Sequence, residues 1–453
     1  MKKFISITAV LVVLIGLAIP IGKVFADTGY DGFIKVRLTS PLRSDKIVKL
    51  YSEGGFSIYC MDNLDKEFEF LDVEEIYATI GDNGEVTLLD SEGNIIYTLN
   101  DDLIITSKDC KDRKVKVEDR YYRGFIMFNV SLDKLCVINY LSLEEYLYGV
   151  LPKEMGYSFH TEALKAQAIA ARTYAIMNFN KHIEEGYNLC DATDCQAYGG
   201  MNVENAKTNE AVDDTEGMII TYNGYPIDAV YHSNSGGHTE SASEVWGGNL
   251  PYLTGVPDEY SESYPNSRWQ LKMDSKEIGD KLCNYSIDVG KVLDIIILDT
   301  TSNGRVKELL IEGDEGKTTL SGDKFRTIIG SNTLKSTFFT ISKENIYDKE
   351  VKIYSIDRNE YIDTIDLNNI NVIGGDGNIR SVNNISSVIT DRGVKNIDLD
   401  ATPMTVNFII DGKGYGHGVG MSQWGAQGMA VNGYSFEEIL KYYYRGVDIE
   451  FKE

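Results

Sequence analysis

The chain has 453 residues and a formal net charge of −25, with 69 acidic residues against 44 Lys and Arg. This balance argues against binding of nucleic acid or of anionic wall polymers through bulk charge. It favours a partner recognised by hydrogen bonds and stacking, and a neutral glycan fits that description. The length allows two or three domains with ample buried core.

The N-terminal segment predicts export. Lys2 and Lys3 precede an apolar run over residues 4–21, and Val24 and Ala26 are small residues at the two positions that a signal peptidase reads. The run is also long enough to span a membrane. We therefore expect residues 1–26 to be a signal peptide or an uncleaved anchor. The protein is then secreted or membrane-anchored outside the cytoplasm, and it contacts membrane only through this segment.

Residues 27–123 predict a β-rich N-terminal module. Short apolar segments at Phe33–Leu38, Val86–Leu89 and Leu103–Thr106 are separated by turns of Gly, Asn, Asp and Ser. Two further strands, at 122–130 and 135–140, are expected to pair and to lead the chain into two helices.

Residues 141–180 predict a helical hairpin around an acidic loop. Ser142 and Glu145 have capping-box spacing, and Pro152 is expected to end the first helix, which leaves Glu154 just beyond it. The second helix, expected to be capped by Thr161, is rich in alanine and suits close packing. Two interpretations stay open at this point. Either the loop is a site around Glu154, or the hairpin is structural and its charges are solvated.

Two polar residues interrupt the small-residue surface of the second helix. Gln167 and Arg172 each need a partner, protein or ligand, if they are held against close-packed backbone.

Six cysteines are too few and too scattered for a disulfide scaffold in a chain of this length. Cys190 and Cys195 are the exception because only four residues lie between them and His182 is close in sequence. This spacing allows a local disulfide, free thiols or a metal site that includes His182. In each case we expect the two cysteines to lie within side-chain reach of one another.

Downstream, a β-hairpin is predicted with Asn223-Gly224 at its turn, between strands at 218–222 and 227–231. It leads into residues 231–238, whose small and polar composition indicates a binding loop or a surface turn. Residues 341–404 predict inserted β-structure, with residues 374–378 at a turn.

Near the C-terminus, glycine alternates with other residues from Gly412 to Gly420. Neither the Rossmann spacing nor the P-loop spacing is present. Alternating glycines bring backbone close to another group, while His417 and Trp424 supply a polar and aromatic wall that suits a sugar ring. A closing helix is expected from Phe436.

Three motifs resemble the stage II sporulation protein D and amidase-enhancer family. They are LEEYLYGVLPKEM at 143–155, EALKAQAIAARTYA at 162–175 and GHGVGMSQWGA at 416–426, in the family's order. The resemblance covers residue 124 to about 340, and 408 to the C-terminus. It implies an α+β fold, with a helical hairpin packed on antiparallel and mixed sheets and a catalytic domain formed by residues 124–340 and 405–453 around the insertion 341–404.

The resemblance implies a lytic transglycosylase that cleaves peptidoglycan glycan strands lacking stem peptides, in sporulation, engulfment or wall remodelling. Glu154 matches the family's catalytic acid. It would protonate the leaving glycosidic oxygen and then deprotonate the C6 hydroxyl, which gives a 1,6-anhydro end. No cofactor is required, although a structural zinc at Cys190 and Cys195 is allowed. The residues expected to contact substrate are Gln167, Arg172, Tyr174, His232, Ser233, Asn234, His417, Ser422, Gln423 and Trp424.

We further expect Arg172, His232, Ser233, His417 and Gln423 to converge around Glu154. Two alternatives come from other functional classes. One is a non-catalytic wall-binding module that activates a cell-wall amidase, which would then be a partner. The other is an acyl hydrolase that uses Ser233 or Ser235 with His232 or His238, although no Gly-x-Ser-x-Gly elbow surrounds either serine.

Overall fold

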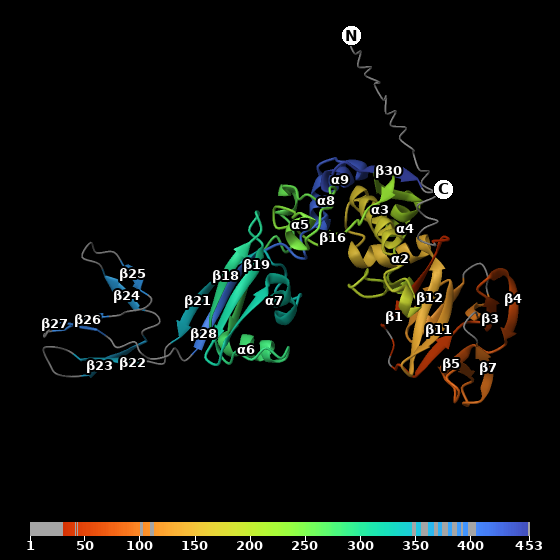
Figure 1. Cartoon of the computed structure of the whole chain (residues 1–453), viewed down its shortest axis with the longest axis horizontal. Coiled ribbons are helices and arrows are strands. Elements are labelled where there is room, and N and C mark those ends of the chain that lie inside the picture. Colours follow the sequence, from red (N-terminus) through yellow and green to blue (C-terminus); the bar gives the residue numbers. More distant parts are fainter. Residues whose placement is uncertain are drawn as a thin grey trace, which may run out of the picture. The chain divides into compact units, whose positions relative to one another are not determined.

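The computed structural model (Figure 1) describes residues 30–451 except 41, 43, 100–102, 109–112, 347–349, 355–360, 367–369, 374–378, 383–386, 391–392 and 397–404. Residues 1–26, the predicted signal peptide or anchor, lie outside the described residues, and so does the predicted turn at 374–378. The chain divides into two compact units. Unit 1 comprises residues 1–230 and 430–453, and unit 2 comprises residues 231–429.

Unit 1 begins with two sheets whose strands pair antiparallel, except for one short parallel strand at the edge of the larger sheet. The strands are β1 Phe33–Leu38, β2 Ile47–Tyr51, β3 Phe56–Cys60, β4 Asn63–Leu71, β5 Glu75–Ile80, β6 Val86–Leu89, β7 Ile95–Leu99, β8 Leu103–Ser107, β9 Lys114–Val117, β10 Arg120–Arg123, β11 Phe125–Ser131 and β12 Lys134–Ser142. The larger sheet has the order β13-β1-β12-β11-β8-β3-β4, where β13 is Leu189–Cys190, and the smaller has the order β10-β9-β2-β5-β6-β7. Alternate residues of β1, such as Ile34 and Val36, are fully buried, as a half-buried strand requires.

The single strand predicted over 122–130 is two strands in the structure. Gly124 separates β10 from β11 and has a φ of +73°, and a Cβ added there would lie 2.6 Å from the carbonyl oxygen of Tyr140. Glycine is needed for this bend because a side chain would be both strained and in collision.

The predicted helical hairpin is α2 Leu143–Glu154 and α3 Thr161–Met177. The capping box of Ser142 and Glu145 is present. Two details of the prediction were wrong. Pro152 lies inside α2, and Glu154 is the last helical residue, because the N–H of Met155 still donates to the carbonyl of Leu151 at 2.8 Å. The cap of α3 is His160, whose Nδ1 accepts from the N–H of Glu162 at 3.3 Å.

The rest of unit 1 surrounds α3. It contains the 3₁₀ turns η1 Ile183–Glu185 and η2 Gly200–Val203, the helices α4 Ala206–Asp213 and α9 Phe436–Tyr443, and a small sheet of β15 Tyr225–Pro226, β14 Met218–Tyr222 and β30 Asp448–Phe451. The alanines of α3 are buried, and α3 packs against α2, α4, α9 and β14. Asn223 and Gly224 both have positive φ, as the predicted hairpin turn requires, but its second strand is the short β15 and not 227–231.

Unit 2 is built around two three-stranded antiparallel sheets, β17-β28-β21 and β18-β19-β20. Their strands are β17 Arg268–Asp274, β18 Val292–Thr300, β19 Val306–Gly313, β20 Lys317–Ser321, β21 Phe339–Ile346 and β28 Thr405–Lys413. The core between them and the helices α6 Ser275–Cys283 and α7 Gly322–Ile329 includes Phe325, Phe408 and Ile410, all fully buried. This unit also contains α5 Ala242–Val245, η3 Glu259–Ser261, and a two-stranded parallel sheet of β16 Tyr231–His232 and β29 Met421–Ser422, which leads into α8 Gln423–Val431.

Within residues 341–404, residues 341–346 belong to β21 and pair with β28, and the rest of the described part forms antiparallel hairpins. They pair β22 Glu350–Tyr354 with β23 Tyr361–Asp366, β24 Ile370–Ile373 with β25 Ile379–Val382, and β26 Ser387–Thr390 with β27 Gly393–Asn396. The predicted α+β class is confirmed, with a β-rich N-terminal region. The predicted domain boundaries stay predictions. No helix within the described ranges is long and apolar enough to cross a membrane.

Candidate active site

Glu154 lies at the C-terminal end of α2. Its side chain is partly buried, and the next residue, Met155, is fully buried. The backbone N–H of Ala197 donates to Glu154 Oε1 at 3.0 Å. This contact ties the carboxyl group to the chain segment that follows the two cysteines, Cys190 and Cys195.

Tyr146, which is also on α2, contacts this segment. Tyr146 is fully buried and donates from its hydroxyl to Gln196 Oε1 at 3.3 Å, while Gln196 Nε2 donates to the carbonyl of Ala171 on α3. Burial raises the pKa of Tyr146 well above its usual value, and the charge of nearby Glu154 acts in the same direction. The Tyr146 phenol therefore stays protonated and donates to the residue that precedes Ala197.

Arg172 and Glu144 form an ion pair between α3 and α2. The guanidinium donates from Nε to Glu144 Oε1 at 2.7 Å and from Nη2 to Oε2 at 2.6 Å, and it also donates to the carbonyls of Met218 and Val212. Arg172 is only 1% exposed. Its contacts lie inside unit 1, so they add no support to the predicted contact with substrate.

The two other residues predicted on α3 differ in exposure. Gln167 is fully buried, whereas Tyr174 is partly exposed. Burial raises the pKa of Tyr174 well above its usual value, and the thiol of Cys195 and the carboxyl of Asp228 act in the same direction. Tyr174 therefore lies near the cysteine loop.

Cys190, Cys195 and His182 come together, and Asp194 joins them. One donor atom from each of the four residues lies within 4.8 Å of all the others. His182 Nε2 lies 3.5 Å from Cys195 Sγ and 3.3 Å from Asp194 Oδ2. Both cysteines are free thiols, and burial raises the pKa of Cys195 to about 12. The expectation that the cysteines lie within reach of one another is confirmed.

This donor set fits a zinc ion. Thiolate, imidazole and carboxylate are its usual protein ligands, and four donors around one ion stand about 3–4 Å apart. The second ring nitrogen of His182 is fixed by Glu185, with Nδ1 and Oε1 2.7 Å apart, as is common for a metal-binding histidine. Asp194 was missed by the sequence analysis, although it lies inside the predicted loop.

In unit 2, His232 and His417 lie side by side. Their ring centroids are 5.5 Å apart, and the half-exposed Trp246 lies 5.1 Å from His417. His417 Nε2 donates to the carbonyl of Tyr231, and Nδ1 accepts from the N–H of Val419. Burial lowers the pKa of His417 to about 4, and burial also lowers the pKa of His232 well below its usual value. Both rings are therefore neutral at pH 7.

The two histidines differ in what their nitrogens bind. His232 is 4% exposed, and its Nδ1 donates to the carbonyl of Val419 at 3.0 Å. Its buried Nε2 has no hydrogen-bond partner among the described residues. Of these two rings, His232 is thus the one that keeps an acceptor for a ligand.

The other predicted residues of unit 2 serve largely to hold the loops. Asn234 is fully buried and donates to the carbonyls of Ser261 and Pro265. Ser422 is fully buried and accepts from the N–H groups of Ser235 and Gly425. Gln423 is 7% exposed. The ring of Trp424 stacks on Tyr264 with centroids 5.0 Å apart, and the backbone N–H of Trp424 donates to the carbonyl of Ser233. Ser233 is partly buried.

Arg305 is a buried residue of this region that the sequence analysis missed. It is 2% exposed, its Nη2 donates to the carbonyl of Ser235 at 2.9 Å, and its Nη1 has no partner in the part of the chain that the structure describes. A Cβ at Gly418 would lie 2.3 Å from Arg305 Cζ, and a Cβ at Gly416 would lie 2.7 Å from His232 Cβ. The alternating glycines thus let the loop pack directly on these two side chains.

The acyl-hydrolase alternative gains no support. Ser235 is fully buried and donates to Asp258 Oδ2 at 2.6 Å. Among the hydrogen bonds of the described residues, none joins Ser233 or Ser235 to a histidine ring. The predicted convergence on Glu154 stays a prediction, because Glu154 and Arg172 belong to unit 1 and the other residues to unit 2.

These observations define an α+β protein in which a helical hairpin presents a partly buried glutamate beside a cysteine loop. A family model described as stage II sporulation protein matches residues 131–222, which contain both features. A model described as a domain of unknown function matches residues 252–357.

Three relatives extend this match. The stage II sporulation protein D of Bacillus subtilis is 31% identical over 327 residues, 68% of this chain and 74% of that protein. The amidase enhancer of the same organism is 32% identical over 321 residues, 67% of this chain but only 40% of that protein. An uncharacterised protein of Brachyspira hyodysenteriae is 32% identical over 329 residues, 72% of each chain. The chain belongs to the stage II sporulation protein D family, which confirms the resemblance carried by the three motifs.

Proposed function

We propose that this protein is a lytic transglycosylase that cleaves peptidoglycan glycan strands lacking stem peptides. The observation that carries the proposal is the position of Glu154: it ends α2 in the motif that matches the family's catalytic acid, partly buried, with Oε1 held by the N–H of Ala197. Family membership supports a role in the cell wall, since relatives are named for sporulation and for amidase enhancement.

The reaction needs one carboxyl group. Glu154 donates its proton to the glycosidic oxygen as the bond from that oxygen to C1 breaks, and the substrate's 2-acetamido group stabilises the developing positive charge, as in substrate-assisted glycosidases. The carboxylate then removes the proton of the C6 hydroxyl, and O6 bonds to C1. Glu154 is reprotonated, no water is consumed, and the products are a 1,6-anhydro end and a new hydroxyl end.

A zinc ion is proposed for the loop beside this residue, held by Cys190, Cys195, His182 and Asp194. When bound, zinc crosslinks thiolate, imidazole and carboxylate ligands and so stabilises the fold. These four residues would fix the loop at Cys195, two residues before Ala197, whose N–H donates to Glu154. Catalysis itself requires no cofactor in this proposal.

The acidic charge and the predicted export signal fit an extracytoplasmic protein that meets neutral glycan in the wall. The alternative is a non-catalytic module that binds the wall and stimulates an amidase. It is favoured by the similarity to the amidase enhancer, although the chain spans only 40% of that relative.

The test is incubation of stripped glycan strands with the mature protein, followed by mass spectrometry. Transglycosylation and hydrolysis differ by one water, so the masses separate anhydro ends from reducing ends. Glu154→Gln keeps the size of the side chain but removes its transferable proton, so the rate should fall by about 10²-fold or more while strand binding survives. Equal rates for the variant and the wild type would exclude Glu154 as the acid. If neither cuts strands while an amidase is still stimulated, the alternative is correct.

A further inference from the structure

We infer that Arg123 and Glu204 are positioning residues for Glu154, acting through residues 196–204, which we term the tethered segment. This inference rests on the proposed function of Glu154. It begins from the contact between the N–H of Ala197 and Glu154 Oε1. Because a backbone group makes this contact, the orientation of the carboxyl group depends on where the tethered segment lies.

The segment is first held against α2. The N–H of Gly199 donates to the carbonyl of Gly149 at 3.0 Å. Gly149 also allows a close approach, because a Cβ there would lie 2.4 Å from the ring of Tyr198. The Tyr198 ring therefore lies directly on the helix that ends at Glu154.

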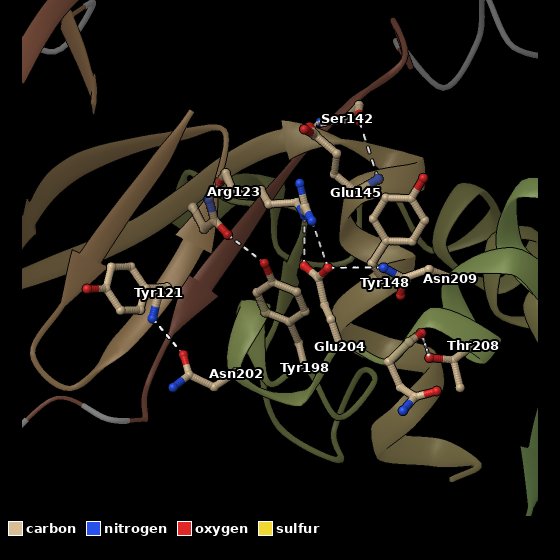
Figure 2. Close-up of polar contacts among 12 residues, drawn as sticks. Tyr121, Arg123, Ser142, Glu145, Tyr148, Tyr198, Asn202, Glu204, Thr208 and Asn209 are labelled. Carbon is tan, nitrogen blue, oxygen red and sulfur yellow. Dashed lines mark hydrogen bonds and ion pairs between the residues drawn. The ribbon is translucent and has the colours of Figure 1, made fainter. Parts of the chain in front are cut away.

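The hydroxyl of Tyr198 connects the segment to the larger sheet. It donates to Asn139 Oδ1 at 2.7 Å, and Asn139 Nδ2 donates to the carbonyls of Arg123 and Phe125. Tyr198 and Asn139 are both buried, so this chain of hydrogen bonds is shielded from water. Figure 2 shows Tyr198 between the strand that bears Arg123 and the helix that bears Tyr148.

The end of the segment is fixed by an ion pair. Arg123 Nε donates to Glu204 Oε1 and Arg123 Nη2 donates to Glu204 Oε2, both at 2.8 Å, and Asn209 Nδ2 adds a bond to Oε2 at 3.1 Å (Figure 2). The side chains are 27% and 12% exposed. Such a two-bond fork fixes direction as well as distance, which a lysine cannot do. Beside it, the N–H of Tyr121 donates to Asn202 Oδ1 at 2.7 Å.

The ion pair between Arg123 and Glu204 thus fixes the C-terminal end of the tethered segment. Ala197, near its other end, contacts the carboxyl group of Glu154. A displacement of about 1 Å at a reacting group can lower a rate about 10²-fold. Removing the pair should therefore lower kcat while the groups that bind glycan stay in place. A purely structural ion pair would lower only the thermal midpoint.

The experiment uses the full mature protein and compares Glu204→Gln, Arg123→Lys and Arg123→Met with Glu75→Gln. Glu75 is the control because it pairs with Lys49 at 2.6 Å between β5 and β2, two strands that carry neither Arg123 nor any residue of the tethered segment. For each variant, kcat and KM on stripped strands, the thermal midpoint and the hydrogen exchange of the Ala197 amide are measured. Arg123→Lys and Glu204→Gln are conservative, so the test survives if Arg123→Met fails to fold.

We expect kcat of Glu204→Gln to fall about 10- to 100-fold with KM within about twofold of wild type. In Glu204→Gln the Ala197 amide should also exchange faster than in the wild type. Arg123→Lys should lower kcat less than Arg123→Met does. Glu75→Gln should match the wild type in kcat and in exchange. Unchanged kcat and exchange in Glu204→Gln, or equal losses in Glu75→Gln, would overturn the inference. The exchange measurement does not require cleavage. A wild type that cuts nothing therefore contradicts the proposed function, whereas unchanged exchange contradicts the positioning role.

Discussion

The guanidinium of Arg172 forms a two-bond ion pair with Glu144 that joins the two helices of the hairpin, with N–O distances of 2.7 and 2.6 Å. Arg172 is 1% exposed, and the Glu144 side chain is 23% exposed. The same guanidinium also donates to the backbone at the end of α4 and the start of β14. One side chain thus connects α2, α3, α4 and β14.

Arg172→Met should lower the free energy of unfolding by about 3–5 kcal/mol, because it removes one partner of a buried pair and leaves carbonyls without their donor. Urea denaturation measures this change. The control is Lys165→Met, because Lys165 is on the same helix as Arg172 and pairs with Asp214 at 2.9 Å. The two side chains of this pair are 19% and 45% exposed. That variant should lose about 1 kcal/mol or less. Equal losses for the two variants would contradict the structural role of Arg172.

Local features of unit 1 could be predicted from the sequence because their causes are local. The capping box of Ser142 and Glu145 spans four residues, and the turn at Asn223 and Gly224 needs only its own backbone preference. The closeness of Cys190 and Cys195 likewise follows from a short loop. Family motifs supplied the expected role of Glu154, which no local pattern contains.

Long-range partners could not be predicted in the same way. Nothing in the spacing says that Arg172 pairs with Glu144, 28 residues away, or that Arg305 donates to Ser235, 70 residues away. Pro152 was expected to end α2, but the helix continues to Glu154 although proline supplies no N–H to the helical ladder. Such outcomes depend on tertiary packing, which overrides local preference.

The acid stability of the protein should depend on His417. Its pKa is about 4 in the folded chain, lowered by burial, against an ordinary value of 6.5. The unfolded state therefore binds more protons between these values. The contribution is fully present above pH 6.5 and is lost as pH falls through about 4, with a limit of about 3 kcal/mol.

Urea denaturation of the wild type and of His417→Gln, at several pH values from 7 to 4, measures this contribution. The loss of stability on acidification should be smaller in the variant, because the variant has no imidazole to protonate at this position. The neighbouring His232, whose pKa burial also lowers, should supply part of the slope that remains. Identical slopes for the two proteins would show that His417 titrates normally.

The cysteine loop should hold one zinc ion per chain. In its absence, burial keeps the Cys195 thiol protonated at neutral pH, since the pKa of this thiol is about 12. Zinc binds the thiolate and displaces that proton, so affinity should fall as pH is lowered, and chelation should lower the thermal midpoint. Metal analysis of the purified protein, combined with a count of reactive thiols before and after chelation, measures both effects.

Cys195→Ser should lose the metal. Cys283→Ser, which removes an exposed free thiol on α6, should keep it. Two thiols at 190 and 195 that react freely in a metal-free protein would refute the site. A pair that becomes reactive only after reduction would instead identify a disulfide.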